Sequence, residues 1–80
     1  MYYLYILKST INNSYYIGSC EDLTKRLNQH NKGKVKSTKR YIPWKIVYTE
    51  TFKYLSKARK REKQIKSWKK RKAIEKLIKK

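Results

Sequence analysis

The stretch MYYLYILKSTINNSYYIG, residues 1–18, decides the fold and holds five of the eight tyrosines of the 80-residue chain. Two runs rich in tyrosine, isoleucine and leucine, at about residues 2–8 and 14–19, flank a polar centre. Aromatic and β-branched residues favour strands, and Asn12 and Asn13 tolerate the positive φ angles of a tight turn. The pattern therefore predicts a β-hairpin.

This hairpin places Tyr5 and Tyr16 on paired strands. Side chains alternate between the two faces of a strand, so the two phenols lie side by side if these residues share a face. Such a pair would sit at one end of a small sheet.

Composition indicates one small basic domain spanning residues 1–80. The chain has 23 lysines and arginines against five acidic residues, a formal net charge of +18. This charge opposes compaction and points to a polyanionic partner, foremost nucleic acid. A membrane surface is the competing partner, but the sequence has no long apolar run. A single cysteine cannot form an internal disulfide and no signal peptide is evident, so we expect a cytoplasmic protein without a membrane partner.

A short helix is predicted at about residues 22–32. Asp22 is a suitable N-cap, and Gly33 suits the left-handed position that follows a helix. Arg26 and His30 are four residues apart on this helix and can point together at the hairpin. Taken alone, they are better explained as a solvated cation and as a histidine favoured by the helix dipole than as functional residues.

The basic segment KVKSTKR, residues 34–40, lacks periodicity and predicts an exposed loop. Its cations either contact phosphates or are simply solvated, and the sequence leaves both interpretations open. The candidates for nucleic-acid binding in this loop are Lys34, Lys36, Lys39 and Arg40.

A third strand is predicted at about residues 44–49, directly after Pro43. In this segment Trp44, Ile46 and Tyr48 recur at every second position. The alternation predicts that these three side chains share one buried face of the strand.

Helical spacing returns at about residues 54–68, and a further amphipathic helix is predicted at about residues 70–79. Glu62 lies on the apolar stripe of the first of these helices, between Ala58 and Ile65. Removing a carboxylate from water is costly unless a cation or a metal ion meets it. A salt bridge, to Arg61, Lys66 or a cation across the sheet, and a metal site are therefore equal alternatives for Glu62.

The ordered set of these residues resembles GIY-YIG nuclease domains, specifically the small single-domain bacterial type related to the N-terminal domain of the excinuclease C protein. Leu4-Tyr5-Ile6 stands at the first motif, and Tyr16-Ile17-Gly18 matches the second. The resemblance covers nearly the whole chain. The remaining motif positions, which follow at family-like distances, are Arg26, His30 and Glu62.

The resemblance implies an α+β fold in which helices flank a three-stranded antiparallel sheet. It also implies a metal-dependent endonuclease that hydrolyses phosphodiester bonds in DNA during repair or processing, without excluding RNA as a partner. Glu62 would ligate Mg²⁺ or Mn²⁺, and Arg26 would neutralise the phosphoryl oxygens.

The remaining site residues would act on the attacking water or on the strand end. Tyr5 and Tyr16 would orient or deprotonate the water, while His30 would accept the proton or hold a tyrosine in place. The sequence leaves the identity of the base open. Gly18 is assigned to the nucleic-acid-binding residues, because a glycine at a strand end permits close approach of a backbone or a phosphate.

Two other classes of protein fit the charge: a nucleic-acid-binding protein of the same fold that lacks turnover, and a small RNA-binding or ribosome-associated protein. Arg26 and Glu62 favour the nuclease, because a pure phosphate binder gains nothing from a carboxylate that faces the phosphate. The chain also departs from the family pattern. Ser19 stands where some relatives carry a lysine, and no asparagine follows Asn31.

Overall fold

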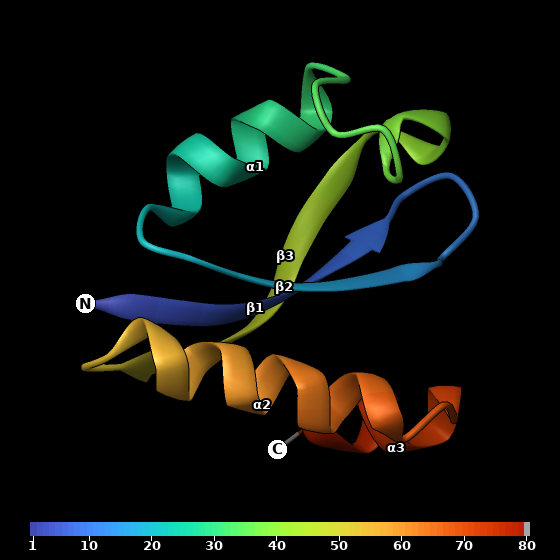
Figure 1. Cartoon of the computed structure of the whole chain (residues 1–80). Helices are drawn as coiled ribbons and strands as arrows, with labels where there is room; N and C mark the ends of the chain where they lie inside the picture. Colours follow the sequence, from blue (N-terminus) through green and yellow to red (C-terminus); the bar gives the residue numbers. More distant parts are fainter. Residues whose placement is uncertain (80) are drawn as a thin grey trace.

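The computed structural model describes residues 1–79 and forms a three-layered α+β structure. Its strands form one antiparallel sheet in the order β2-β1-β3. Helix α1 covers one face of the sheet, and α2 and α3 cover the other (Figure 1). The predicted fold, a three-stranded antiparallel sheet flanked by helices, is thus confirmed. The elements are β1 (Tyr2–Ser9), β2 (Tyr15–Cys20), α1 (Leu23–Asn31), the 3₁₀ helix η1 (Lys39–Tyr41), β3 (Trp44–Phe52), α2 (Leu55–Ser67) and α3 (Arg71–Ile78).

The central strand β1 is buried on both faces and therefore supplies two cores. Its alternate residues Leu4 and Ile6 have no exposed surface and pack towards α2 and α3. Tyr5 and Leu7 face the other way, towards α1. Each core is small, as expected for a chain of this length. The other buried members are Ile17, Ile65 and Leu77 in the first core and Cys20 and Trp44 in the second.

Local signals at the hairpin and at α1 behave as predicted. Asn13 takes the left-handed conformation of the turn, with φ of 63°. Asp22 caps α1 by accepting a hydrogen bond from the backbone N–H of Lys25 at 3.0 Å. Gly33 follows the helix with φ of 75°, and Lys34 donates its backbone N–H back to the Gln29 carbonyl at 3.0 Å.

Strand β3 is longer than predicted, and its alternation is interrupted. Trp44 and Ile46 pack with the α1 core, but Tyr48 packs with the core beneath α2 and α3. The register of β1 and β3 shifts because Ile6 pairs with Tyr48 while Leu7 pairs with Ile46. One extra residue on β3 turns the following side chains to the other face. The expectation that Tyr48 shares a face with Trp44 and Ile46 is therefore wrong.

The end of α1 is clamped to the start of β3 by one side chain. Asn31 accepts the Trp44 backbone N–H at 2.6 Å and donates to the Trp44 carbonyl at 3.0 Å, as a neighbouring strand would. The Trp44 indole N–H donates to the Thr38 carbonyl at 2.8 Å. These bonds fix the loop between α1 and β3 against the sheet.

Helices α2 and α3 are separate, because Lys69 between them takes a left-handed conformation with φ of 55°. Within residues 1–79, no helix combines the length and the apolar character needed to cross a membrane.

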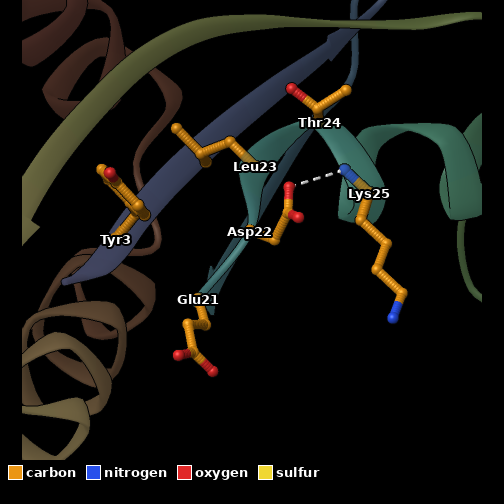
Figure 2. Close-up of a pocket in the computed structure, with 6 residues that line it drawn as sticks. All are labelled: Tyr3, Glu21, Asp22, Leu23, Thr24 and Lys25. Carbon is orange, nitrogen blue, oxygen red and sulfur yellow. Dashed lines mark hydrogen bonds between the residues drawn. The ribbon is translucent and has the colours of Figure 1, made fainter.

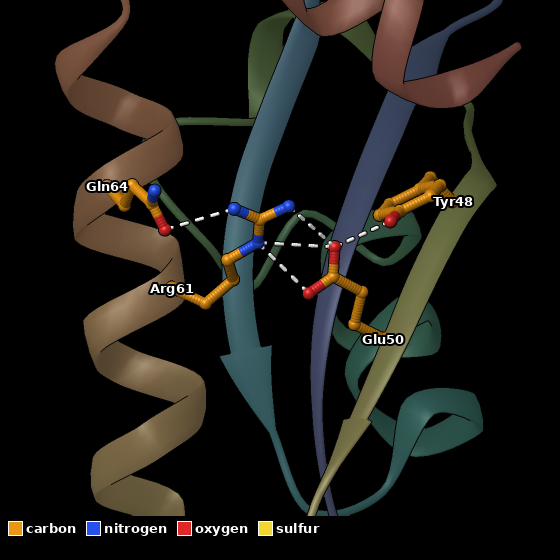
Figure 3. A network of polar contacts seen from close by, with 4 residues as sticks. All are labelled: Tyr48, Glu50, Arg61 and Gln64. Atoms are coloured by element: carbon orange, nitrogen blue, oxygen red, sulfur yellow. Dashed lines mark hydrogen bonds and ion pairs between the residues drawn. The ribbon is translucent and has the colours of Figure 1, made fainter. Parts of the chain in front are cut away.

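An ion pair between Glu50 and Arg61 joins β3 to α2 (Figure 3). Arg61 donates from Nε to Oε1 and from Nη2 to Oε2 of Glu50, both at 3.0 Å. The Tyr48 hydroxyl donates to the same carboxylate at 2.5 Å, and Gln64 accepts from Arg61 at 3.0 Å. The charged side chains are 24% and 22% exposed, so water screens this pair less than a surface pair.

Replacing Glu50 by glutamine is expected to destabilise the protein at neutral pH by about 1–2 kcal/mol. Burial alone would raise the pKa of Glu50, but hydrogen bonds from Arg61 and Tyr48 hold it below its ordinary value of 4.5. A lowered carboxyl pKa stabilises the fold above pH 4.5, and this contribution is lost as the pH falls further. Urea unfolding at pH 7 and at about pH 3 should therefore show the difference between the two proteins shrinking in acid.

The matched control is Glu75→Gln, which removes the more exposed carboxylate of the Arg71–Glu75 pair on α3. We expect it to change the free energy of unfolding by less than about 0.5 kcal/mol. A loss for Glu50→Gln that is the same at both pH values would contradict the assigned role of its charge.

Candidate active site

Tyr5 lies at the centre of the sheet, opposite Gly18 on β2. Its ring covers that glycine: a Cβ atom at residue 18 would lie 2.6 Å from Tyr5 Cζ. Only a residue without a side chain leaves room for the phenol. The close approach expected at Gly18 is therefore made by a neighbouring tyrosine, and Gly18 is buried beneath its ring rather than placed on the surface.

The Tyr5 phenol is joined to His30 of α1, and the two residues are only 3% and 1% exposed. Tyr5 Oη lies 3.1 Å from His30 Nε2, and His30 Nδ1 lies 2.7 Å from Thr38 Oγ1. Thr38 donates its hydroxyl to the Val35 carbonyl at 3.3 Å, so it accepts from His30. This chain of bonds assigns the proton to Nδ1 and leaves Nε2 to accept from Tyr5.

Burial keeps both members of this pair neutral. It raises the pKa of Tyr5, and the neighbouring Tyr16 adds to that effect while the charge of Arg26 opposes it. Burial also lowers the pKa of His30, and Arg26 acts in the same direction. Because the His30 Nε2 lone pair is taken by Tyr5, neither group is placed to remove a proton from water.

Tyr16 is the second phenol of the group and, unlike Tyr5, it is partly exposed. Its ring centroid lies 6.4 Å from that of Tyr5 and 4.9 Å from that of His30. Lys66 Nζ, from α2, lies 5.9 Å from the same centroid. The Tyr16 hydroxyl has no hydrogen-bond partner among the residues that the structure describes, which leaves it available to a water molecule or a substrate.

Arg26 stands one turn before His30 on α1. Its charge lowers the pKa values of Tyr5, Cys20 and His30. It forms no ion pair within residues 1–79, and it lines a hollow whose other residues are Cys20, Glu21, Asp22, Lys25 and Gln29. A half-buried guanidinium without a carboxylate partner is suited to bind an external anion.

Glu62 approaches the group from α2, on the other face of the sheet. Its Oε1 accepts from Ser19 Oγ of β2 at 2.7 Å, and its Oε2 accepts from Lys66 Nζ at 2.7 Å. The carboxylate is 21% exposed and borders a depression shared with Arg59, Lys63 and Lys66. The structure thus contains the salt bridge that was one of the two alternatives for Glu62.

Glu62 is also the residue that could hold a divalent metal ion. Within residues 1–79, there is no group of three or more His, Cys, Asp or Glu side chains that could together hold a metal ion. The available donor is therefore one carboxylate, whose oxygens have further lone pairs beside their present bonds. Mg²⁺ is commonly held by one or two carboxylates together with substrate phosphates. Glu62 therefore fits a Mg²⁺ ion if a substrate phosphate supplies further oxygen ligands.

The structure brings Tyr5, Tyr16 and His30 into one group and places Arg26 beside it. Glu62 is connected to the group through Lys66, which contacts both its carboxylate and the Tyr16 ring. Arg26 and Glu62 line different hollows.

A further hollow, of about 630 Å³, lies at the start of α1 (Figure 2). Its lining includes Tyr3, Glu21 and Asp22, and none of the predicted site residues. Asp22 is already engaged as the helix cap. We therefore assign no chemistry to this hollow.

Two residues of the site, Thr38 and Ser19, were not predicted. Thr38 lies within the loop 34–40 yet is fully buried against His30, whereas the four loop cations are exposed. Ser19 of β2 donates a hydrogen bond to Glu62 of α2, and these two elements are far apart in sequence. Lys66, four residues after Glu62 on the same helix, is one of the salt-bridge candidates that the sequence offered.

The bonds around His30 predict its tautomer and its titration. Nitrogen NMR of the single histidine should show a protonated Nδ1 and an unprotonated Nε2. This neutral form should persist below pH 6.5, the ordinary histidine value, because the pKa of His30 is lowered. Thr38→Val removes the acceptor of the Nδ1 proton and should destabilise the protein by about 1–3 kcal/mol. A ring that titrates at its ordinary value, or that carries its proton on Nε2, would contradict the assignment.

Comparison with known proteins places this geometry in a family. The family model described as "GIY-YIG catalytic domain" matches residues 1–77. A UPF0213 protein of Staphylococcus saprophyticus is 41% identical over 78 residues, covering 96% of this chain and 93% of the relative. A UPF0213 protein of Staphylococcus aureus is 37% identical over 79 residues, covering 98% and 94%. The solution NMR structure of a UPF0213 protein from Bacillus halodurans matches with a TM-score of 0.61 and 31% identity, covering 99% of this chain and 84% of that one. The chain therefore belongs to the GIY-YIG family, as one of its small single-domain proteins.

Proposed function

We propose that this chain is a metal-dependent endonuclease that hydrolyses phosphodiester bonds in DNA, in repair or a related processing step. Family membership supports a nuclease-type activity, and a net charge of +18 supports nucleic acid as the substrate. The observation that carries the proposal is Glu62, a carboxylate retained among three cations of one depression. A protein that only bound phosphate would bind more tightly without it. Residues 1–80 would act as one domain in the cytoplasm, where the unpaired Cys20 stays reduced.

Tyr16 is the group assigned to the attacking water. Tyr5 and His30 are bonded to each other and buried, whereas the Tyr16 hydroxyl is available. Tyr5 and His30 are therefore positioning residues: they support the Tyr16 ring from the α1 side at centroid distances of 6.4 and 4.9 Å. Tyr16 would orient the water and accept its hydrogen bond in line with the phosphorus atom.

Arg26 is assigned to the phosphate under attack. Its guanidinium carries a fixed fork of N–H donors that matches two phosphate oxygens. The phosphate gains negative charge at these oxygens as the water attacks, so donors aimed at them favour the transition state. The absence of a carboxylate partner for Arg26 within residues 1–79 leaves these donors free for the substrate.

Glu62 would hold the divalent ion beside the leaving oxygen. When bound, such an ion supplies Lewis-acid stabilisation of the charge on that oxygen. Ser19 fixes the orientation of the carboxylate through its 2.7 Å bond to Oε1. Lys66, which bonds Oε2, would move to a phosphate oxygen and keep the local charge balanced.

A second candidate function is nucleic-acid binding without turnover, on the same fold. One observation favours it: both oxygens of Glu62 already have partners, Ser19 and Lys66. In that case Glu62 would serve as an anchor between α2 and β2.

Incubation of the protein with supercoiled plasmid, branched DNA and single-stranded DNA tests the proposal. We expect cleavage with Mg²⁺ or Mn²⁺ and none in EDTA. Tyr16→Phe, Arg26→Ala and Glu62→Gln should each lower the rate by about 10²–10³-fold, the usual effect of removing one transition-state contact. Lys63→Gln is the matched control, because Lys63 borders the same depression as Glu62 and should leave most of the rate intact.

The outcomes separate the two candidates. Cleavage that survives both Arg26→Ala and Glu62→Gln would come from a contaminating nuclease and would contradict the proposal. A wild-type protein that binds all three DNA forms but cleaves none with either metal ion would establish the binding function instead.

A further inference from the structure

A group of cations surrounds Tyr15, on the face of the sheet opposite Tyr16. The two tyrosines are consecutive in β2, so their side chains point to opposite faces. Tyr15 packs with the core beneath α2 and α3, whereas Tyr16 packs with the α1 core. In the adjacent strand, Lys8 pairs with Tyr15 on one side and with Lys45 of β3 on the other. We call Lys8, Lys45, Arg71 and Tyr15 the Tyr15 cluster.

Two of these cations are held against the Tyr15 ring. Arg71 Cζ lies 4.5 Å from the ring centroid, and Lys8 Nζ lies 5.8 Å from it. The carboxylate that contacts the cluster, among residues 1–79, is Glu75, whose Oε2 lies 3.7 Å from Arg71 Nε. That pair is long and half exposed, so most of the N–H donors of Arg71 remain free.

Lys8 and Lys45 oppose each other across neighbouring strands, which is unfavourable for the free protein. Like charges directly opposite in an antiparallel pair are destabilising, because their Cβ atoms are only about 5 Å apart. The strand register holds the Cβ atoms of the two lysines at this spacing, while the Lys8 ammonium group lies over Tyr15. A bound anion would turn the repulsion into a favourable contact with both ammonium groups.

We propose that the Tyr15 cluster is a phosphate-binding subsite for the nucleic-acid backbone, separate from the Arg26 and Tyr16 site. The inference rests on the proposed function in taking nucleic acid as the partner. Because β2 is an outer strand of the sheet, a backbone that crosses it meets Tyr16 on one face and the Tyr15 cluster on the other. Arg71 is already oriented by the ring, so little conformational freedom is lost when it binds phosphate.

Binding of a labelled DNA duplex in EDTA, measured by fluorescence anisotropy across a salt series, tests this subsite. Lys8→Gln with Lys45→Gln should weaken binding and reduce the slope of log K against log salt by about 1–2, since each lost phosphate contact removes about 0.9. Arg71→Gln, an exposed single change, should reduce the slope by about 1. The lysine double variant should also unfold at a temperature no lower than the wild type, because the repulsion is removed.

The control is Lys57→Gln with Lys60→Gln, which removes two charges from α2 near Phe52, on the β3 side. It should leave the slope nearly unchanged. Equal weakening by the control and by the cluster variants would show diffuse attraction and overturn the subsite. The test is independent of turnover, because EDTA prevents metal-dependent cleavage. If the protein cleaves DNA but the cluster variants leave the salt slope unchanged, only the subsite proposal is wrong. If the variants change the slope as expected but the protein never cleaves DNA, only the nuclease proposal is wrong.

Discussion

The hydrogen bond between Tyr5 and His30, made directly above Gly18, is the contact on which the site depends. Tyr5 belongs to the central strand and His30 to the end of α1, so the bond sets the height of that helix over the sheet. It is possible because Gly18 has no side chain where the phenol lies. His30 in turn forms a hydrogen bond with Thr38, and this bond holds the loop before β3 in place. One buried phenol thereby orients three separate segments around Tyr16.

The scarcity of acidic residues is the second constraint on the molecule. With a formal charge of +18, the chain has only five acidic residues with which to offset repulsion, and four of them make defined contacts. One caps a helix, one joins β3 to α2, one joins α2 to β2, and one pairs with an arginine on α3. These residues are, in that order, Asp22, Glu50, Glu62 and Glu75. Five acidic residues cannot neutralise 23 cations, so a polyanion would complete the electrostatics of the fold.

Features decided by near neighbours in sequence could be predicted, and those decided by strand register or by tertiary contact could not. The hairpin turn at Asn13 and the cap at Asp22 follow from side chains within a few residues. The face of Tyr48 could not be predicted, because a bulge depends on how the partner strand pairs. The positions of Tyr5, Tyr16 and His30 could be predicted as a group. The partners that fix their roles, Thr38 above all, come from a loop whose path no local pattern specifies.

Gly18 leaves the space that the Tyr5 ring occupies, and a double-mutant cycle on these two residues tests this role most directly. Gly18→Ala alone should destabilise the protein by about 1–3 kcal/mol, because the new methyl group overlaps a packed ring. In a Tyr5→Leu background, which removes the end of that ring, the same substitution should cost far less, leaving a coupling energy of about 1 kcal/mol or more. Urea unfolding of the four proteins gives the values. If Gly18→Ala destabilises both backgrounds equally, the glycine is needed for another reason and its assigned role beneath the Tyr5 ring is wrong.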